Sequence, residues 1–355
     1  MKLWAIVLGV LAVVVSLGYS FRGPIAIQIM RVAVPRLIMA DPIAELPDGL
    51  HLTLCGAGSP LPDPKRSGPC VGIVAGGTLF VVDSGGGSAR NLARMGLPPA
   101  DVEAVFLTHF HSDHIDGLGE LALQRWIGRN GAEPLPLFGP EGVERIAAGF
   151  SEAYQLDVGY RISHHGEDVL PPTGAGFEAR PFPTPTAGSP VVVWDRDGVR
   201  VTSFRVDHAP IDPAVGYRFD YAGRSLVISG DTIKTPELER ISQGVDLLVH
   251  EALAAQLVSI ITEAAREAGD TPRAKMTRDI LDYHATPIDA AETAAAADVG
   301  HLLYYHVVPP LVLPGMAAAF LDGVDEVYSG DFTLGQDGTH ITLPAGGTSI
   351  EVTGG

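Results

Sequence analysis

The sequence predicts an α/β fold in which polar side chains gather where buried strands end. Short apolar runs such as Val105–Leu107, Val199–Val206 and Ser225–Ile228 have the length and composition of strands. Each is followed by histidine or aspartate, and layered α/β folds place their sites at such strand ends. With 355 residues, of which 46% are hydrophobic, the chain can bury the core of one large domain or two ordinary ones.

The segment Thr108–His114 is the most informative part of the chain, because its last six residues carry three imidazoles and one carboxylate. Side chains two residues apart share a face of an extended segment, so His109 and His111 can hold one metal ion together. Asp113 and His114 are adjacent and would point apart in a strand, so we expect a turn that sends them toward a second ion. A His-rich surface loop is the alternative, but this density of zinc-type ligands favours a metal site.

Three later strands end in residues of the same type. His208 follows Val199–Val206, Asp231 follows Ser225–Ile228, and His306 ends a further apolar run. Because each lies where a strand stops, the fold can bring all three to the edge that carries the first group. The sequence therefore predicts one site assembled from segments far apart in the chain.

The spacing His-x-His-x-Asp-His, with the three later strand ends, resembles the signature of the metallo-β-lactamase superfamily. The resemblance implies a four-layer αββα sandwich and two Zn²⁺ ions per chain. It implies a ligand set in which the first ion is held by His109, His111 and His208, the second by Asp113, His114 and His306, and both by a bridging Asp231. Asp83 resembles the superfamily's first-motif aspartate, which orients a ligand histidine.

Four shorter segments resemble the ribonuclease Z and arylsulfatase branch of that superfamily. They are Leu54–Pro60, Ser229–Thr232, His250–Ala252 and Tyr283–Thr286. In that branch the histidine matching His284 is thought to donate a proton to the leaving group, and we expect Asp113 and Asp231 to act with it in catalysis. Glu251 either orients His284 or is a satisfied polar residue beneath the site.

Two departures favour the arylsulfatase-like members over ribonuclease Z itself. The stretch from His208 to Asp231 has room for little more than a hairpin, whereas ribonuclease Z carries a long tRNA-binding arm there. Val307–Pro310 replaces the Ser-x-Arg-Tyr type segment that follows the last ligand in ribonuclease Z. With 24 Lys and Arg against 42 Asp and Glu, the formal net charge of −18 opposes binding to a phosphate backbone. These features predict a small-molecule ester as the substrate and disfavour nucleic acid as a partner.

The resulting prediction is a dinuclear zinc hydrolase in which a metal-bridging hydroxide attacks a small ester, with an aryl sulfate or a phosphodiester as first candidates. A ribonuclease Z-type tRNA 3′ endonuclease is one alternative, and a lactonase or β-lactamase is another. An iron-dependent oxidoreductase of the persulfide dioxygenase kind represents a different class, but it holds a single iron. A catalytically dead binding protein is disfavoured because no ligand is missing. A homodimer is left open.

The N-terminus predicts a targeting or membrane segment ahead of the hydrolase domain. Residues 1–20 combine Lys2 with a long apolar run, which fits a signal anchor or a signal peptide. Residues 21–48 are predicted to be an apolar juxtamembrane linker, 49–345 the hydrolase domain and 346–355 a C-terminal tail. We expect export to the periplasmic or cell-envelope side, with the N-terminal helix as a membrane anchor.

Cys55 and Cys70 are the only cysteines, and they flank a loop rich in Gly, Pro and Ser. A disulfide between them would suit an exported protein and would stabilise the fold by about 3 kcal/mol in the chain-entropy model. Two small buried thiols are an equally good interpretation. Neither cysteine belongs to the metal set.

Overall fold

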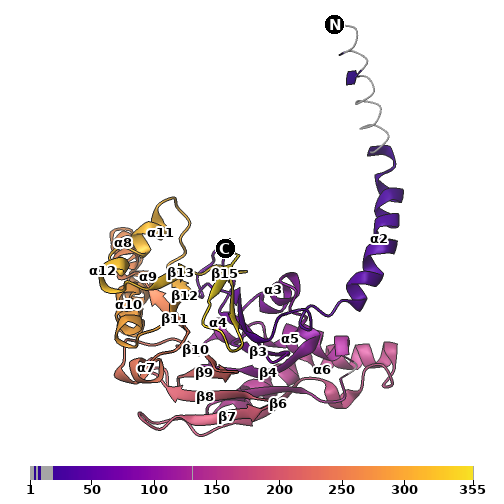
Figure 1. The fold of residues 1–355 in the computed structure, drawn as a ribbon, viewed down its shortest axis with the longest axis horizontal. Helices are drawn as coiled ribbons and strands as arrows, with labels where there is room; N and C mark the ends of the chain where they lie inside the picture. The colour runs from indigo at the N-terminus through magenta and orange to yellow at the C-terminus, as the bar shows by residue number, and fades with distance from the viewer. Residues whose placement is uncertain (1–3, 5–6, 9–18, 130, 355) are drawn as a thin grey trace. The chain divides into compact units, whose positions relative to one another are not determined.

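The computed structural model describes residues 4, 7–8, 19–129 and 131–354, and the chain divides into two compact units. The first unit, Met1–Glu45, contains helix α2 (Arg22–Met39), which has no buried residue. The second unit, Leu46–Gly355, carries both β-sheets and every predicted ligand. Figure 1 shows the elements of each unit.

The second unit is built on two sheets that pack face to face (Figure 1). The first sheet has the order β15-β14-β1-β2-β3-β4-β5-β6, and the second has the order β13-β12-β11-β10-β9-β8-β7. The strands of the first sheet are β1 (Gly49–Gly56), β2 (Cys70–Ala75), β3 (Thr78–Val82), β4 (Val102–Phe106), β5 (Leu135–Gly139), β6 (Phe177–Pro181), β14 (His340–Pro344) and β15 (Glu351–Thr353). Those of the second are β7 (Val191–Arg196), β8 (Val199–Arg205), β9 (Val215–Tyr221), β10 (Arg224–Ile228), β11 (Leu247–Leu253), β12 (His301–Val308) and β13 (Asp331–Leu334).

Helices cover the outer faces of both sheets. On the first sheet these are α3 (Ser88–Arg94), α5 (Leu118–Arg129) and α6 (Val143–His165), and on the second they are α7 (Pro236–Ile241) and α10 (Pro287–Ala296). The remaining helices are α4 (Ser112–Ile115), α8 (Ala255–Glu267), α9 (Thr271–Asp279), α11 (Met316–Phe320) and α12 (Val324–Val327), with the 3₁₀ turns η1 (Pro99–Asp101), η2 (Pro172–Gly174) and η3 (Ile280–Asp282). The predicted α/β fold with two sheets is confirmed.

Alternating side chains of the central strands fill two cores, one on each side of the second sheet. On β12, Leu303 and Tyr305 join the core between the sheets, whereas Leu302 and Tyr304 join the core beneath the helices. Successive side chains of a strand point to opposite faces, and all eight residues of β12 are buried because both faces are covered. This is why the strand reads as a continuous apolar run.

Aromatic side chains tie the two sheets together. Phe80 of β3 contacts Trp194 of β7 with ring centroids 5.1 Å apart, and Phe106 of β4 contacts Phe219 of β9 at 5.8 Å. Both are edge-to-face contacts, each of which contributes about 0.5–1.5 kcal/mol beyond the area it buries. These contacts hold β4 against the second sheet. The segment after β4 therefore lies at a defined distance from the segment after β10.

The predictions for the chain ends have different outcomes. The signal or membrane segment at residues 1–20 lies mostly outside the described residues, and none of the described helices is long and apolar enough to cross a bilayer. The membrane-helix part of the fold prediction is therefore not supported. Residues 21–48, predicted as an apolar juxtamembrane linker, contain α2. Residues 346–355 contain β15, which pairs with β14 at the edge of the first sheet.

Cys55 and Cys70 form a disulfide, with their Cα atoms 5.0 Å apart. It joins the end of β1 to the start of the neighbouring strand β2 and closes the intervening loop. Of the two interpretations that the sequence left open, the structure has the disulfide.

Candidate metal centre

The seven predicted ligands lie on segments that follow or end strands of the two sheets. They are His109 and His111 after β4, Asp113 and His114 in α4, His208 after β8, Asp231 after β10 and His306 near the end of β12. Strands β10, β11 and β12 are parallel, so their carboxyl ends meet at one edge. Residues far apart in sequence therefore converge, and His306 Nε2 lies 3.3 Å from Asp113 Oδ2 across 193 positions.

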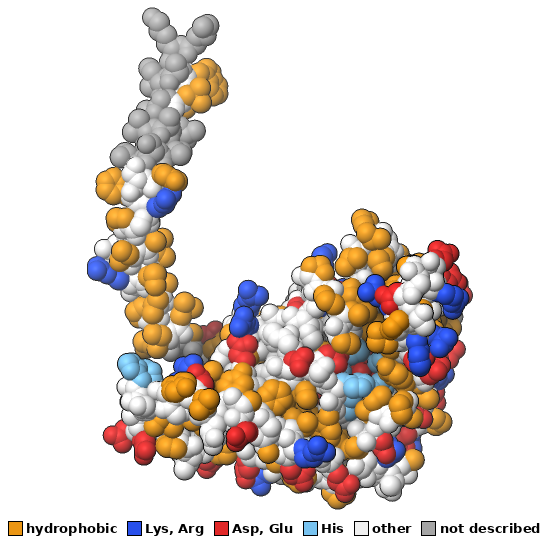
Figure 2. Space-filling view, turned by 180° about the vertical axis from the view of Figure 1, so that it is seen from behind, with side chains coloured by type: hydrophobic (Ala, Val, Ile, Leu, Met, Phe, Trp, Pro, Cys, Tyr) orange, Lys and Arg blue, Asp and Glu red, His pale blue; other side chains and the backbone are white. Residues whose placement is uncertain are grey.

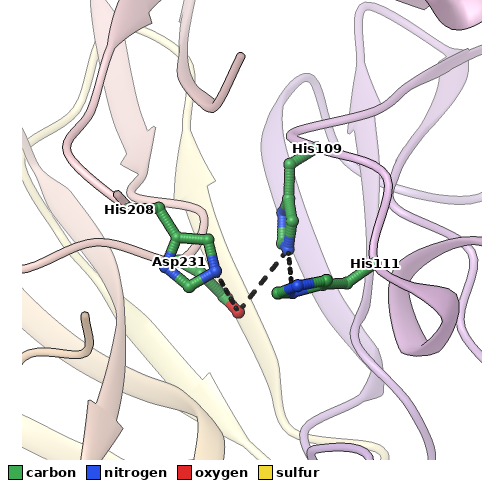
Figure 3. Close-up of side chains that lie close together, drawn as sticks. All are labelled: His109, His111, His208 and Asp231. Carbon is green, nitrogen blue, oxygen red and sulfur yellow. Dashed lines mark hydrogen bonds and ion pairs between the residues drawn. The ribbon is translucent and has the colours of Figure 1, made fainter. Parts of the chain in front are cut away.

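His109, His111, His208 and Asp231 form a first group, which Figure 3 shows pointing toward one another. Each offers one ligand atom, and these atoms lie within 4.8 Å of one another. Asp231 Oδ2 is 3.8 Å from His109 Nε2 and 3.9 Å from His208 Nε2. His109 Nε2 and His111 Nδ1 are 3.0 Å apart. The sequence assigned these four residues to the first ion and its bridge.

Asp113, His114 and His306 form a second group, whose ligand atoms are equally close. Asp231 Oδ2 lies 3.4 Å from His114 Nε2 and 3.3 Å from His306 Nε2. One carboxylate oxygen of Asp231 therefore lies within 4 Å of imidazoles from both groups. That is the position expected of a bridging ligand.

The turn expected after His111 is the start of helix α4. His111 has extended backbone angles, with φ −62° and ψ 149°, and the helical residues begin directly after it. Asp113 and His114 lie in that single turn and are buried. The change from extended to helical backbone separates the side chains of His111 and His114, so that they reach different groups.

His306 is aimed at the site by a bulge in β12. Across from β11, Tyr305 pairs with Glu251 and Val307 pairs with Ala252, so His306 is the extra residue. Its φ of +45° is uncommon for a residue with a side chain. Bulges re-aim side chains beside active sites, and such backbone strain is typical of functional positions.

Gly230 is required by the turn that presents Asp231. Its φ is +63°, and a Cβ there would lie 2.8 Å from the carbonyl oxygen of Val215. Only glycine adopts this conformation freely and leaves room for that neighbour. The Ser-Gly-Asp pattern after β10 is therefore a structural requirement for placing the carboxylate.

Asp83 contacts His114 directly and reaches His109 through Thr108. His114 Nδ1 lies 2.8 Å from Asp83 Oδ2. The Thr108 hydroxyl donates to the same oxygen at 2.8 Å, and its own oxygen lies 3.1 Å from His109 Nδ1. Hydrogen bonds at Nδ1 fix each ring and leave Nε2 facing the cluster, which is the usual arrangement around ligand histidines.

The cluster presents buried atoms that a metal ion would satisfy. Among the described residues, His114 Nε2, His208 Nε2 and Asp231 Oδ1 are buried without a hydrogen-bond partner. The three residues are at most 2% exposed. Leaving a buried polar atom unpaired costs about 1–3 kcal/mol, so such atoms are rare unless they have a function. Nitrogen and carboxylate donors at these distances fit a zinc-type ion.

Burial opposes charge on the buried histidines. It lowers the pKa of His109 well below its ordinary value and also lowers the pKa of His111 and of His208. A neutral imidazole is the form that binds a cation.

At His114 the carboxylates of Asp231, Asp83 and Asp113 outweigh the effect of burial and raise the pKa well above its ordinary value. Burial would raise the pKa of Asp231, but the imidazoles of His306 and other ligands hold it well below its ordinary value. An ionised carboxylate is the form that binds a cation.

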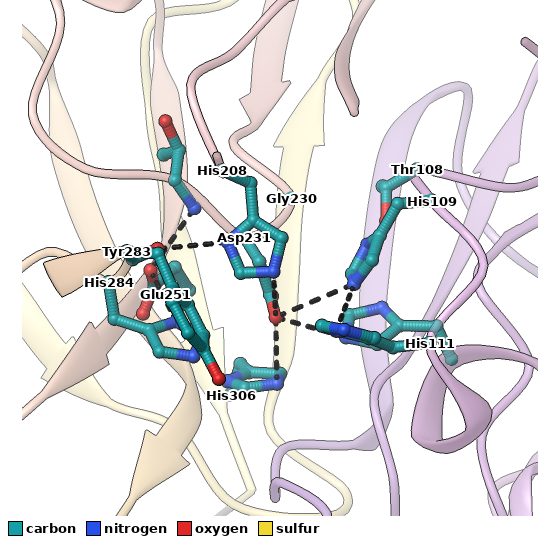
Figure 4. A network of polar contacts seen from close by, with 12 residues as sticks. Thr108, His109, His111, His208, Gly230, Asp231, Glu251, Tyr283, His284 and His306 are labelled. Carbon is teal, nitrogen blue, oxygen red and sulfur yellow. Dashed lines mark hydrogen bonds and ion pairs between the residues drawn. The ribbon is translucent and has the colours of Figure 1, made fainter. Parts of the chain in front are cut away.

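His284 lies beside the cluster and is held by Glu251 (Figure 4). Glu251 Oε1 lies 2.9 Å from His284 Nδ1, and it also accepts the backbone N–H groups of Ala285 and Thr232. Burial lowers the pKa of His284, but the Glu251 carboxylate more than offsets this and raises it to about 9. These contacts support orientation of His284 as the role of Glu251, and they leave His284 protonated at neutral pH.

A cavity of about 630 Å³ opens beside the cluster, a size typical of ligand sites. His111, Asp113, Asp231, His284 and His306 line part of it. Figure 2 shows histidine side chains at the surface of the second unit, with hydrophobic side chains next to them. The candidate metal centre is therefore open to a substrate.

Three contributions to the site were not predicted from the sequence. The carbonyl oxygen of Tyr283 accepts from His208 Nδ1 at 2.9 Å, and Thr108 links Asp83 to His109. Ser59 lines the cavity with a buried hydroxyl that has no partner among the described residues. A backbone carbonyl carries no sequence signal, although both Tyr283 and Ser59 lie in segments that the motifs had singled out.

Two mycobacterial proteins named ribonuclease Z are similar to this chain over most of its length. The protein of Mycobacterium avium (strain 104) is 37% identical over 290 residues, which cover 81% of this chain and 96% of that protein. The protein of Mycobacterium marinum is 37% identical over 265 residues, which cover 74% of this chain and 88% of that protein.

These relatives overturn the predicted partners. The sequence was taken to indicate a small-molecule ester substrate and to disfavour nucleic acid, and this is wrong because the relatives are named as ribonucleases. The net charge of −18 was a poor guide to the substrate, because it sums charges over the whole surface. Binding of nucleic acid depends on the electric field near the site, to which bound metal ions also contribute. The segment after His208 is the expected hairpin of β9 and β10, yet the chain matches nearly all of a ribonuclease Z.

The family comparison and the solved structures agree with this fold. The protein-family sequence model described as the metallo-beta-lactamase superfamily matches residues 64–270 of this chain. Human tRNase Z, short form, has a TM-score of 0.58 at 20% identity and covers 83% of this chain and 99% of its own. The metallo-beta-lactamase fold protein YhfI from Bacillus subtilis has a TM-score of 0.59 at 17% identity, covering 83% and 100%. The chain therefore belongs to the metallo-β-lactamase superfamily, as a metal-dependent hydrolase homologous to ribonuclease Z.

Proposed function

We propose that the protein is a ribonuclease of the ribonuclease Z type, which hydrolyses a phosphodiester bond at the 3′ side of a precursor tRNA. The observation that carries the proposal is the convergence of both ligand groups on Asp231 Oδ2 beside an open cavity. The similarity to proteins named ribonuclease Z supports RNA as the substrate class.

We propose two zinc ions as the cofactor. His109, His111 and His208 would hold one, Asp113, His114 and His306 the other, and Asp231 both. Such a pair supplies a water of lowered pKa and positive charge that offsets the charge developing on the phosphate. The buried Asp83 would keep the rings of His114 and, through Thr108, of His109 in place when the ions bind.

His284 is the proposed proton donor to the leaving oxygen. Its Nδ1 is engaged by Glu251, so Nε2 is the nitrogen available to a bound substrate. In the reaction water first releases a proton to solvent. The oxygen of the resulting hydroxide forms a bond to phosphorus as the P–O bond to the leaving ribose oxygen breaks, and His284 supplies the proton to that oxygen. Glu251 stabilises the imidazolium before the transfer and fixes the ring through the neighbouring backbone of Ala285.

An exported location is a separate proposal, and it competes with processing of the cell's own precursor tRNA, because an exported enzyme would meet only RNA outside the cytoplasm. The disulfide of Cys55 and Cys70 supports export, because disulfides persist in oxidising compartments. A test is to compare the redox state of the two cysteines in whole cells and in a cytoplasmic fraction. Fully reduced thiols in cells would contradict export.

The function is tested with a precursor tRNA that carries a labelled 3′ trailer. We expect the wild-type protein to release the trailer by a single cut and Asp231→Ala to be inactive. Asp331→Ala is the matched control, because Ser329-Gly330-Asp331 repeats the tripeptide Ser229-Gly230-Asp231 at the start of β13, where Asp331 is exposed. An intact precursor, with rapid hydrolysis of an aryl sulfate by the same preparation, would contradict the proposal.

A further inference from the structure

The cavity beside the metal centre has an apolar wall that the reaction itself does not use. Val258 and Ile261 of α8, Met276 of α9 and Ile280 of η3 line it, together with Val308 at the end of β12. Val258, Ile261 and Met276 come from the helices α8 and α9, which follow β11. None of them can bind a metal ion or move a proton.

The wall is held rigidly against the metal centre. Val258 and Val308 are almost fully buried, and Ile280 packs against them. The Thr262 and Thr277 hydroxyls form a hydrogen bond of 2.8 Å, which ties α8 to α9. Because Val308 lies two residues beyond His306 on the same strand, the wall has a fixed distance from the second ligand group. A site held this way can position a substrate.

The outer part of the wall is apolar and open. Met276 is 61% exposed and Ile261 is partly exposed. Both line the cavity whose other wall carries the proposed metal-binding side chains. Arg273, one turn before Thr277, is the only Lys or Arg among the described residues that line this cavity. Exposed apolar side chains next to a few polar groups are typical of a ligand site.

We infer that this wall, formed by Val258, Ile261, Met276 and Ile280, is a nucleobase subsite for a nucleotide adjacent to the scissile phosphate. The inference rests on the proposed function and adds which part of the RNA the cavity recognises. A phosphodiester at the metal centre brings with it a flat, largely apolar base, and every base has a face that can pack on such side chains. Arg273 lines the same cavity with its Nε 3.2 Å from Asp270 Oδ2, and it is the cation that the phosphate of that nucleotide would recruit.

The experiment removes the base rather than the phosphate. Precursor RNAs are made with an abasic ribose at each of the two positions on either side of the scissile bond, one position at a time. Wild-type kcat/KM should fall several-fold at one of these positions, toward the low end of the about 5- to 150-fold range known for bases stacked on aromatic rings, because this wall is aliphatic. The other positions should show little change.

Variants then connect that loss to the wall. Met276→Ala and Ile261→Ala should lower kcat/KM on the complete RNA and shrink the penalty of the abasic substitution, because the base no longer has its partner. Met276 is largely exposed, so its truncation should not impair folding. Ile260→Ala is the matched control, since Ile260 is the neighbouring residue of α8, is 63% exposed and lies outside the cavity lining.

The outcomes separate this inference from the proposed function. A wild-type protein that does not cut the complete RNA refutes the proposed function, and the subsite falls with it. A wild-type protein that cuts all abasic RNAs as well as the complete one refutes the subsite alone. An abasic penalty that Met276→Ala and Ile261→Ala leave unchanged also refutes it, because the base would then be bound elsewhere.

Discussion

Replacing His284 by Ala tests the proton-donor assignment most sharply. The imidazole touches Glu251 through one hydrogen bond and is not needed for the two ligand groups to meet. Losing a hydrogen bond to a charged group destabilises the fold by about 1.5–3 kcal/mol. Glu251 keeps the N–H groups of Ala285 and Thr232 as partners, so the variant should still fold.

The rate effect of His284→Ala should depend on the leaving group. General acid catalysis contributes about 10²–10⁴-fold, and the full loss should appear with RNA, whose leaving alcohol is weakly acidic. Aryl esters of a 5′-nucleotide should show a smaller loss as the phenol becomes more acidic, because a nitrophenolate departs without a proton. The assay is a leaving-group series on wild type and variant, with the metal content of both.

His284→Gln is the control for structure. Its amide can still donate to Glu251 but has no transferable proton, so it should recover stability and not rate. An equal drop across all leaving groups would refute the acid role. Loss of a metal ion from His284→Ala would instead make it a ligand, because its ring nitrogen lies within 4.8 Å of ligand atoms of Asp231 and His306.

Three further predictions concern the surroundings of the site. Asp83→Asn should weaken zinc affinity by about 10- to 100-fold in a chelator competition, because Asp83 accepts the Thr108 N–H at Oδ1 and His114 Nδ1 at Oδ2, whereas an amide has one accepting oxygen. Unchanged affinity would contradict its supporting role. Replacing both cysteines by Ser should lower the free energy of unfolding, measured in urea, by about 3 kcal/mol, because the disulfide closes a loop with a sequence separation of 15. An unchanged midpoint of the urea transition would contradict this prediction. A chain starting at Leu46 should keep its RNA cleavage rate, and a folded but inactive product would show that the first unit contributes to the site.

The strand signals predicted that the seven proposed ligands converge, whereas their division into two ligand groups came from the resemblance to the superfamily and stays a prediction. His109 and Asp231 follow apolar runs that can only be buried, and strand ends of one edge must meet. The bulge at His306 was not predictable, because it depends on the register between β11 and β12 and not on a residue type. The contact between His208 and the Tyr283 carbonyl was not predictable either, because a backbone carbonyl carries no residue-type signal.

The substrate was harder to infer than the site. Net charge is a property of the whole surface, and the apolar lining of the cavity is formed by α8 and α9, which the sequence presents as ordinary helices. Which face of such a helix borders a cavity depends on packing that no local pattern encodes. The segment at residues 1–20 stays a prediction, since most of it lies outside the part of the chain that the structure describes.

In the proposed metal centre seven residues hold two ions, and Asp231 contacts both. The direct measurement is anomalous diffraction at the zinc edge from crystals of protein purified without chelator. We expect two zinc peaks, one among His109, His111 and His208 and one among Asp113, His114 and His306, with Asp231 contacting both. A single peak, or iron in place of zinc, would contradict the account.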